Sequence, residues 1–276
     1  MIEGVKVGQC CHFGGQVGEC VPMTTTTQFH TETLGSPSLP TLVMLHGWGQ
    51  TLLSLKPFGE LLSRDYQVVL VDLPGFGKSP APQAVWDSTA YAHALVQHLE
   101  SKGIKHFDLL GHSFGGRVSL RLAAYYPERV NRLILMASHG LPTPRPLKSR
   151  LRLKVLGWLR SLLKIVDASI GTKFFESWFV PRFASKDYRQ AGILRGIFVK
   201  LVTEDASSDV AKIKAPTLML WGQDDTETPV ELGQRIKGLL QKAEMYVFPL
   251  HDHHPYTNAG HHLLTRYVLD FKARYA

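Results

Sequence analysis

The chain has 276 residues, of which 44% are hydrophobic and 20% are charged, a composition that predicts a buried core and excludes a disordered chain. No apolar run approaches the roughly 18 residues that a membrane-spanning helix needs, so we expect a soluble protein. The formal net charge is +8, from 31 Lys and Arg against 23 Asp and Glu.

The first 22 residues contain all three cysteines, Cys10, Cys11 and Cys20. An odd number with two adjacent members suits neither a disulfide framework nor a zinc site, which favours a reducing, cytoplasmic compartment. The segment also lacks the basic start and the apolar run of about 7–15 residues that mark a signal peptide. We therefore expect residues 1–22 to be a disordered extension, with translation starting at Met23 and Met1 as the alternative start.

Short apolar runs then alternate with helical patterns, first over residues 23–140 and again over 206–276. The predicted strands are Gln28–Thr33, Thr41–Leu45, Gln67–Val71, Phe107–Leu110, Arg132–Met136, Thr217–Trp221 and Glu244–Phe248. The predicted helices are Leu52–Ser63, Ser88–Lys102, Phe114–Tyr126, one beginning at Pro229, and Asn258–Arg274. Fully apolar strands separated by helices of about 10–15 residues indicate a mostly parallel sheet with helices on both faces.

The alternation stops over residues 141–205, which contain helical patterns and aromatic residues but no strand-like run. We expect this segment to be a helical lid lying over one edge of the sheet. Its residues 147–166 form one amphipathic helix on a 100° wheel, with Arg160 and Lys164 opposite the apolar half. The apolar half contains Leu147, Leu151, Val155, Leu156, Trp158, Leu159, Leu162, Leu163, Ile165 and Val166.

The excess positive charge lies in this lid, because Arg145 to Lys200 contains 13 basic and three acidic residues. The simplest explanation of these basic residues is that they form the solvated polar face of the lid helix. Attraction of an anionic substrate, or transient contact with an anionic membrane surface, is the alternative. No pattern of interleaved aromatic and basic residues accompanies the charge, so nucleic acid is not an expected partner. We expect a monomer or a weak dimer.

The sharpest motif is Gly111–Gly115 (GHSFG), which joins a predicted strand to a predicted helix. In G-x-S-x-G the serine stands on a tight, strained turn between strand and helix, and the glycines remove Cβ atoms that would clash. The hydroxyl of Ser113 then projects above the sheet beside the positive end of the helix. This context favours a nucleophilic serine over a serine in an ordinary turn.

Three further motifs follow predicted strands, in the order His46–Gly49 (HGWG), Asp72–Ser79 (DLPGFGKS) and Trp221–Asp225 (WGQDD). Together with the GHSFG turn, they resemble the α/β-hydrolase superfamily over roughly residues 28–276. The resemblance implies an α/β-hydrolase fold with a helical lid inserted after the sixth strand. It also implies a catalytic Ser…Asp…His triad in that chain order, with no cofactor.

The family places the triad acid after the strand that ends at Trp221, or in some members one strand earlier. No carboxylate occurs from Asn131 to Val166, which excludes the earlier position. Asp224 and Asp225 remain, and the W-G-x-x-D spacing of the family favours Asp225 with Asp224 as the runner-up.

The base is expected after the last strand, where His251, His253 and His254 occur together. The family spacing V-F-P-x-x-G-H favours His253, with His251 as the runner-up. Asp252 replaces the usual glycine, and aspartate tolerates a left-handed backbone better than most residues. Three histidines without a defined carboxylate ligand do not indicate a metal site.

The same resemblance assigns the oxyanion hole to the backbone N–H groups of Trp48 and Phe114. Trp158, Phe175 and Trp178 in the lid are candidates for the substrate pocket. His46 is expected to have a structural role in its turn.

Serine at position 113, where epoxide hydrolases and haloalkane dehalogenases of this fold use aspartate, points to a serine esterase that forms an acyl-enzyme. We expect a carboxylic ester or thioester as substrate. One alternative is hydrolysis of a C–C bond in a carboxylate-bearing diketone, for which a lid arginine pointing into the pocket would be the sign. An alternative of another class is a non-catalytic receptor or scaffold built on the same fold.

Overall fold

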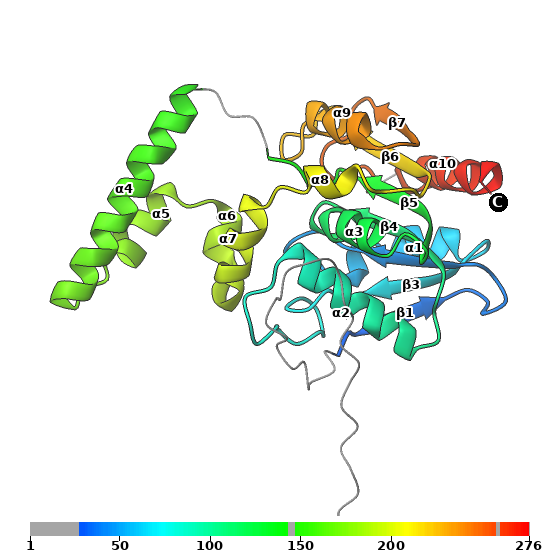
Figure 1. Ribbon diagram of the computed structural model, residues 1–276, viewed down its shortest axis with the longest axis horizontal. Coiled ribbons are helices and arrows are strands. Elements are labelled where there is room, and N and C mark those ends of the chain that lie inside the picture. The colour runs from blue at the N-terminus through cyan, green and yellow to red at the C-terminus, as the bar shows by residue number, and fades with distance from the viewer. Residues whose placement is uncertain (1–27, 143–146, 258–259, 276) are drawn as a thin grey trace, which may run out of the picture.

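The computed structural model describes residues 28–142, 147–257 and 260–275. The extension predicted at residues 1–22 lies outside the described residues. The described chain forms one sheet with helices against it and a helical insertion that extends away from it (Figure 1).

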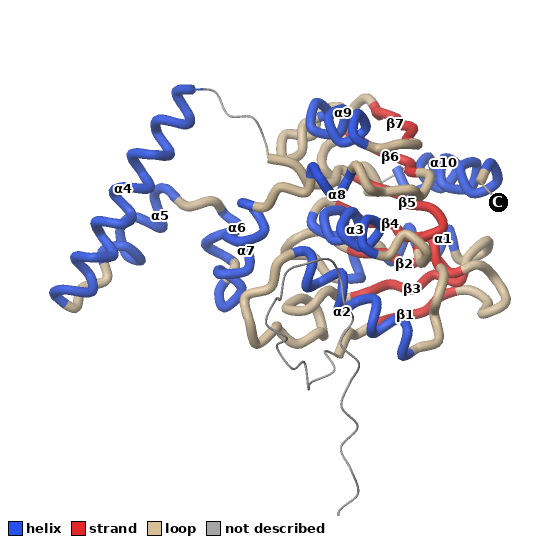
Figure 2. Tube along the Cα trace, viewed as in Figure 1, coloured by secondary structure: helices blue, strands red, loops and turns tan. Residues whose placement is uncertain are grey.

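Seven strands form the sheet in the order β1-β3-β2-β4-β5-β6-β7, and only β1 runs antiparallel to its neighbour. Their bounds are β1 Thr31–Leu34, β2 Thr41–Leu45, β3 Gln67–Val71, β4 Phe107–His112, β5 Val130–Met136, β6 Thr217–Gly222 and β7 Ala243–Phe248. Figure 2 shows these strands as the red centre of the molecule. The predicted mostly parallel sheet is confirmed.

Helices cover both faces of this sheet. Helices α1 (Lys56–Leu62) and α10 (Gly260–Arg274) pack on one face, with the short η1 (Leu52–Ser54) ahead of α1. Helices α2 (Ser88–Ser101), α3 (Phe114–Tyr125) and α9 (Val230–Leu239) pack on the other face. Strand β2 shows the division, since Val43 and Leu45 enter one core while Leu42 and Met44 enter the other.

Strands β2 and β3 have the predicted bounds, and β4 to β7 each extend one or two residues beyond the predicted bounds at one end. Strand β1 begins at Thr31, three residues after the predicted start. The helical insertion follows β5, the fifth strand of the described sheet, whereas the resemblance placed it after the sixth. The reason is that a single described strand, β1, precedes β2.

The insertion consists of short helices after one long helix. Their bounds are α4 Leu147–Ile170, η2 Phe175–Phe179, α5 Val180–Phe183, α6 Lys186–Gln190, η3 Gly192–Leu194, α7 Arg195–Thr203 and α8 Ser207–Val210. Helix α4 is four residues longer than the predicted Leu147–Val166. Within the described residues, no helix combines the length and apolarity needed to cross a membrane.

A small core of its own holds the outer part of the insertion together. Phe175, Phe179 and Val180 are buried there, and α4 packs on them through Leu156, Leu159 and Leu163. Helix α4 therefore lies against η2 and α5, at a distance from the sheet (Figure 1). This differs from the expected lid helix closed over the sheet edge.

Buried ion pairs fix the inner end of the insertion to the core. Arg121 on α3 pairs with Asp209 on α8, and Arg117 lies 3.7 Å from the Glu204 carboxylate. Glu204 also accepts the backbone N–H of Ser88 at the start of α2, at 2.9 Å. Removing one member would leave a buried charge unpaired, so this end of the insertion is anchored firmly.

The turn after β3 is organised by Asp72, whose side chain is almost fully buried. Its carboxylate accepts the backbone N–H groups of Leu52 at 2.8 Å and Lys78 at 3.0 Å, and it lies 2.9 Å from Nδ1 of His30. Burial raises the pKa of Asp72, but these hydrogen bonds outweigh that effect, and the pKa lies below its ordinary 3.8.

Replacing Asp72 with alanine should lower the free energy of unfolding by about 2–4 kcal/mol, since it leaves buried N–H groups without an acceptor. Ionised Asp72 stabilises the fold above its ordinary pKa, and this contribution should decrease as pH falls through about 4. Urea unfolding at pH 7 and at pH 3 measures both effects. The exposed Glu60→Ala control should change stability by less than about 0.5 kcal/mol, and an equal loss in both variants would contradict the role of Asp72.

Candidate active site

Ser113 stands between β4 and α3 in a strained backbone conformation, with φ 51° and ψ −110°. A Cβ on Gly111 would meet the carbonyl oxygen of Gly115 at 2.5 Å, and one on Gly115 would meet that of Leu45 at 2.4 Å. Both positions therefore require glycine, as the motif predicts. Positive φ at a buried non-glycine residue is costly and is typical of functional sites.

Asp225 and His253 are brought together from the loops after β6 and β7. Nδ1 of His253 lies 2.9 Å from Oδ2 and 3.1 Å from Oδ1 of Asp225. Both side chains are buried, with 4% of Asp225 and 6% of His253 exposed. The pair that the family spacing favours is thus the pair that the fold joins.

The Asp225 carboxylate is held in its ionised form. Burial raises its pKa, but hydrogen bonds from His253 and Thr228 outweigh burial, and the pKa lies below the ordinary value. The backbone N–H groups of Glu227 and Thr228 also donate to Oδ1, at 2.9 and 2.8 Å. An ionised carboxylate in this place fixes the Nδ1–H tautomer of His253 and leaves Nε2 free to accept a proton.

Thr228 is part of this arrangement and was not predicted. Its hydroxyl lies 2.7 Å from Oδ2 of Asp225, 3.2 Å from Nδ1 of His253 and 3.0 Å from the carbonyl oxygen of Ala137. The side chain is fully buried. The sequence feature that could have identified Thr228 is its position just before Pro229, because a small hydroxyl residue there can reach the carboxylate three residues earlier.

Changing Thr228 to valine should lower kcat/KM about tenfold, because the shape is kept while the hydroxyl that orients the Asp225–His253 pair is lost. Thr228→Ser keeps the hydroxyl and should stay within about threefold of wild type. Steady-state kinetics at one pH, with unfolding curves for both variants, measures the effect. Full activity in Thr228→Val would show that the hydroxyl has no positioning role.

The gap between Ser113 and His253 is not bridged in this structure. Both residues are described, and no hydrogen bond joins Oγ of Ser113 to the imidazole. Nε2 of His253 instead lies 3.5 Å from the carboxylate of Glu227, a side chain that is 60% exposed. Catalytic hydrogen bonds are often long without substrate, and an exposed glutamate can move aside.

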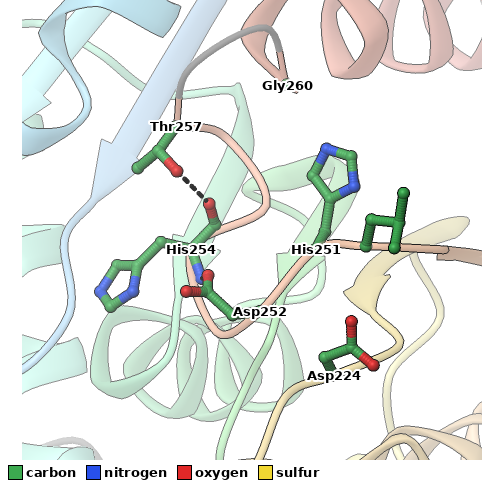
Figure 3. A pocket seen from close by; sticks show the side chains of 7 residues that line it. Asp224, His251, Asp252, His254, Thr257 and Gly260 are labelled. Atoms are coloured by element: carbon green, nitrogen blue, oxygen red, sulfur yellow. Dashed lines mark hydrogen bonds between the residues drawn. The ribbon is translucent and has the colours of Figure 1, made fainter.

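The runner-up residues, Asp224 and His251, lie outside the buried pair. They line an open pocket of about 280 Å³ together with Asp252 and His254 (Figure 3). Nδ1 of His251 lies 2.9 Å from the carbonyl oxygen of Pro249, and no described contact connects its ring to Asp225 or Ser113. Figure 3 shows the two runner-up side chains on the pocket wall, not in contact with each other.

Asp252 does not adopt the left-handed backbone expected of the glycine it replaces. Positive φ occurs two residues earlier, at Leu250, with φ 62°. Asp252 holds the turn through its carboxylate, which accepts the backbone N–H of His254 at 2.8 Å. The turn therefore forms with aspartate at this position, and a hydrogen bond to the aspartate side chain stabilises it.

His112 supports the loop that carries His253. Its Nε2 lies 2.9 Å from the carbonyl oxygen of His253, and its other nitrogen is 3.3 Å from Oε1 of Gln50. Burial lowers the pKa of His112 well below the ordinary value, which keeps the ring neutral. Sequence reasoning assigned no role to this residue, since its contacts come from distant segments.

Aromatic side chains surround the predicted oxyanion hole. The Trp48 ring lies 5.0 Å from Phe76, 5.6 Å from Phe114 and 5.1 Å from Phe198 on α7, measured between centroids. His46 lies beneath this cluster, where Nε2 accepts the backbone N–H of Leu73 at 3.0 Å, in the structural role expected of it. An apolar wall beside Ser113 suits the uncharged part of a small substrate.

The lid residues predicted for the substrate pocket lie elsewhere. Phe175 is buried in the small core of the insertion, Trp158 is 69% exposed on α4, and Trp178 lies against Arg182 on the surface. The structure thus does not bring them to Ser113. The aromatic side chains that contact Trp48 include Phe76 and Phe198, and Phe198 belongs to α7, not to α4.

Within the described part of the chain, no cluster of three or more His, Cys, Asp or Glu side chains is arranged to hold a metal ion. The loops after β6 and β7 bring together the buried Asp225–His253 pair and the Thr228 hydroxyl. A histidine–aspartate pair of this kind can move a proton to and from a serine.

The chain is similar in sequence to bacterial hydrolases. A 2-hydroxy-6-oxononadienedioate/2-hydroxy-6-oxononatrienedioate hydrolase of Paraburkholderia phymatum is 32% identical over 75% of this chain and 78% of its own. A 2-hydroxy-6-oxo-6-phenylhexa-2,4-dienoate hydrolase of Burkholderia cepacia is 30% identical over 75% of this chain and 79% of its own. The crystal structure of a bacterial membrane phospholipase A superposes with a TM-score of 0.70 at 25% identity, covering 90% of this chain and 83% of that one.

The family model of the alpha/beta hydrolase fold matches residues 40–259, which include the Ser113 turn, Asp225 and His253. Strands β2 to β7, the strained serine and the helical insertion all lie within that range. The chain therefore belongs to the α/β-hydrolase family and is an enzyme of that family.

Proposed function

We propose that this enzyme is a serine hydrolase in which Ser113 attacks a carbonyl carbon, His253 moves the proton and Asp225 orients His253. The observation that carries this proposal is the strained Ser113 on the same sheet edge as a buried Asp225–His253 pair. The N–H groups of Trp48 and Phe114 are the proposed donors to the oxyanion.

The bond we propose for cleavage is the C–C bond of a carboxylate-bearing diketone. The support is that the two relatives at 30–32% identity, each matched over three quarters of this chain, are hydrolases of 2-hydroxy-6-oxo acids. These relatives favour this activity over the ester hydrolysis expected from the sequence.

The proposed reaction has two half-steps. Oγ of Ser113 adds to the 6-oxo carbon while Nε2 of His253 takes its proton, and the electrons of the C=O bond move onto the oxyanion. Collapse of this oxyanion requires the diketone tautomer, in which the proton of the 2-hydroxyl group has moved to C5. Collapse then breaks the C5–C6 bond, and the released electron pair is delocalised through the C3=C4 double bond onto the 2-oxo oxygen, which takes the proton from His253. Water then attacks the acyl-enzyme with His253 as base, releasing the second acid and Ser113.

Three of the described lid arginines contact partners within the insertion. Arg195 pairs with Glu176 at 2.7 Å, Arg182 lies over the Trp178 ring, and Arg189 donates to the carbonyl oxygen of Pro181. Arg195 begins α7, the helix whose Phe198 contacts Trp48, so it is our candidate for binding the substrate carboxylate.

Turnover of 2-hydroxy-6-oxo-6-phenylhexa-2,4-dienoate against p-nitrophenyl butyrate tests the choice of bond. We expect kcat/KM to be at least about 100-fold higher for the dienoate than for the ester. Cleavage of the dienoate is measured by the loss of its conjugated absorbance. A higher value for the ester would overturn C–C hydrolysis while leaving the Ser113 mechanism in place.

Ester hydrolysis is the second candidate, and two features of the site favour it. The wall formed by Trp48, Phe76 and Phe198 is apolar, and Glu227 places a negative charge 3.5 Å from Nε2 of His253. A neutral ester would meet no repulsion there. The membrane phospholipase A at 25% identity is an ester hydrolase by name.

A further inference from the structure

Helix α4 carries an apolar face that no other part of the described chain covers. Val155, Trp158, Leu162 and Ile165 fall within an arc of about 80° on the helix wheel, and we call them the bare face. They are 57%, 69%, 41% and 64% exposed, respectively. Isolated exposed apolar residues are ordinary, but a row of four on one helix is typical of an interaction surface.

The bare face is not the face that holds α4 in place. The neighbouring row, Leu156, Leu159 and Leu163, packs on the small core of Phe175, Phe179 and Val180. Helix α4 thus buries one apolar row and leaves the next one open. Ile170 at the end of the helix and Phe174 beyond it are also exposed, by 66% and 49%.

The insertion that carries the bare face is strongly basic. Arg160 and Lys164 are exposed on the opposite side of α4, and Arg182 lies against the half-exposed Trp178. The whole stretch from Arg145 to Lys200 has 13 basic and three acidic residues. An apolar row with a tryptophan, backed by Lys and Arg, is the arrangement of a helix that lies in the interface of an anionic bilayer.

Charge favours an anionic membrane over a second copy of the chain as the partner of the bare face. Two insertions that met through their bare faces would bring together two strongly positive segments, which repel each other. An anionic membrane surface attracts both. The insertion extends away from the sheet, and α4 lies apart from the strands and from α1, α2 and α3 (Figure 1).

We propose that the bare face of α4 docks this enzyme on the surface of anionic membranes. The apolar side chains enter the boundary between headgroups and acyl chains, while the basic residues of the insertion contact the anionic headgroups. The docking is reversible, because a single amphipathic helix inserts far more shallowly than a spanning helix. This proposal does not depend on which bond Ser113 cleaves.

Sedimentation of the full chain with unilamellar vesicles tests the proposal. One set of vesicles is phosphatidylcholine alone and the other contains 30% phosphatidylglycerol. Binding to the anionic vesicles should be at least about tenfold tighter and should weaken with added salt. Absence of binding to the anionic vesicles, or equal binding to both sets, would overturn the proposal.

A pair of double variants separates the bare face from general hydrophobicity. Trp158→Ala with Ile165→Ala should weaken binding to the anionic vesicles by about tenfold or more. Leu53→Ala with Val85→Ala removes apolar side chains that are 62% and 55% exposed on the core, and should bind like wild type. Unfolding curves for both double variants verify that each is folded.

Two results would show that the bare face contacts a partner other than a membrane, and either would overturn the proposal. One is dimerisation of wild type in sedimentation velocity that the bare-face variant abolishes. The other is unchanged vesicle binding in that variant together with a several-fold higher KM for a soluble substrate, which would indicate that the face closes over Ser113.

Discussion

Ser113→Ala should lower kcat by about 10⁴- to 10⁶-fold, because it removes the atom that attacks the substrate. The substitution deletes only Oγ from a side chain that is 6% exposed and takes part in no described side-chain hydrogen bond. Alanine bears the strain of φ 51° as serine does, so the free energy of unfolding should change by less than about 1 kcal/mol. Turnover and urea unfolding of the same preparation separate the two effects.

The matched control is Ser63→Ala, at the end of α1, whose hydroxyl donates to the carbonyl oxygen of Glu60 at 2.7 Å. It should retain wild-type turnover. If Ser113→Ala kept more than about a tenth of the activity, the nucleophile would have to be another residue or a water molecule.

Asp225→Asn should lower kcat/KM by about 10⁴-fold. The amide cannot replace the two carboxylate oxygens that lie 2.9 and 3.1 Å from Nδ1 of His253, and its NH₂ group favours the wrong imidazole tautomer. Because the pKa of Asp225 is lowered, its charge is present throughout the pH range of a kinetic experiment, and the loss should be similar at pH 6 and pH 8.

Asp224→Asn makes the same chemical change one residue earlier, on the wall of the open pocket, and should stay within about threefold of wild type. Steady-state kinetics of the two variants side by side gives the comparison. Equal losses, or a larger loss in Asp224→Asn, would show that the exposed carboxylate orients the base.

The core of the fold follows from local patterns. Strands β2 and β3 occur at the predicted residues. A parallel strand that is buried on both faces reads as a short continuous apolar run in the sequence, which makes it easy to predict. The Ser113 turn is marked by its sequence motif, although the contacts that require its two glycines include Leu45 of β2, far away in the chain. Asp225 after β6 and His253 after β7 were predicted from the motif spacing of the family that the chain resembles, and the structure places the two side chains in contact.

Long-range contacts account for what was missed. Thr228, His112 and Glu227 meet His253 across 25 to 141 residues of chain, and no local pattern marks such meetings. The position of α4 depends on the small core of Phe175 and Phe179 and not on its own periodicity. Amphipathicity predicted an apolar face, but one helix can divide that face between a core and a surface.

The most direct test of Ser113 as the nucleophile is covalent labelling with a fluorophosphonate, read by intact mass and peptide mapping. The proposal predicts one adduct per chain, located on the peptide that contains Ser113 and absent from Ser113→Ala. Labelling should slow strongly in Asp225→Asn, since His253 would no longer be oriented to take the proton. An adduct on another residue, or an unlabelled wild type that turns over substrate, would contradict the proposed mechanism.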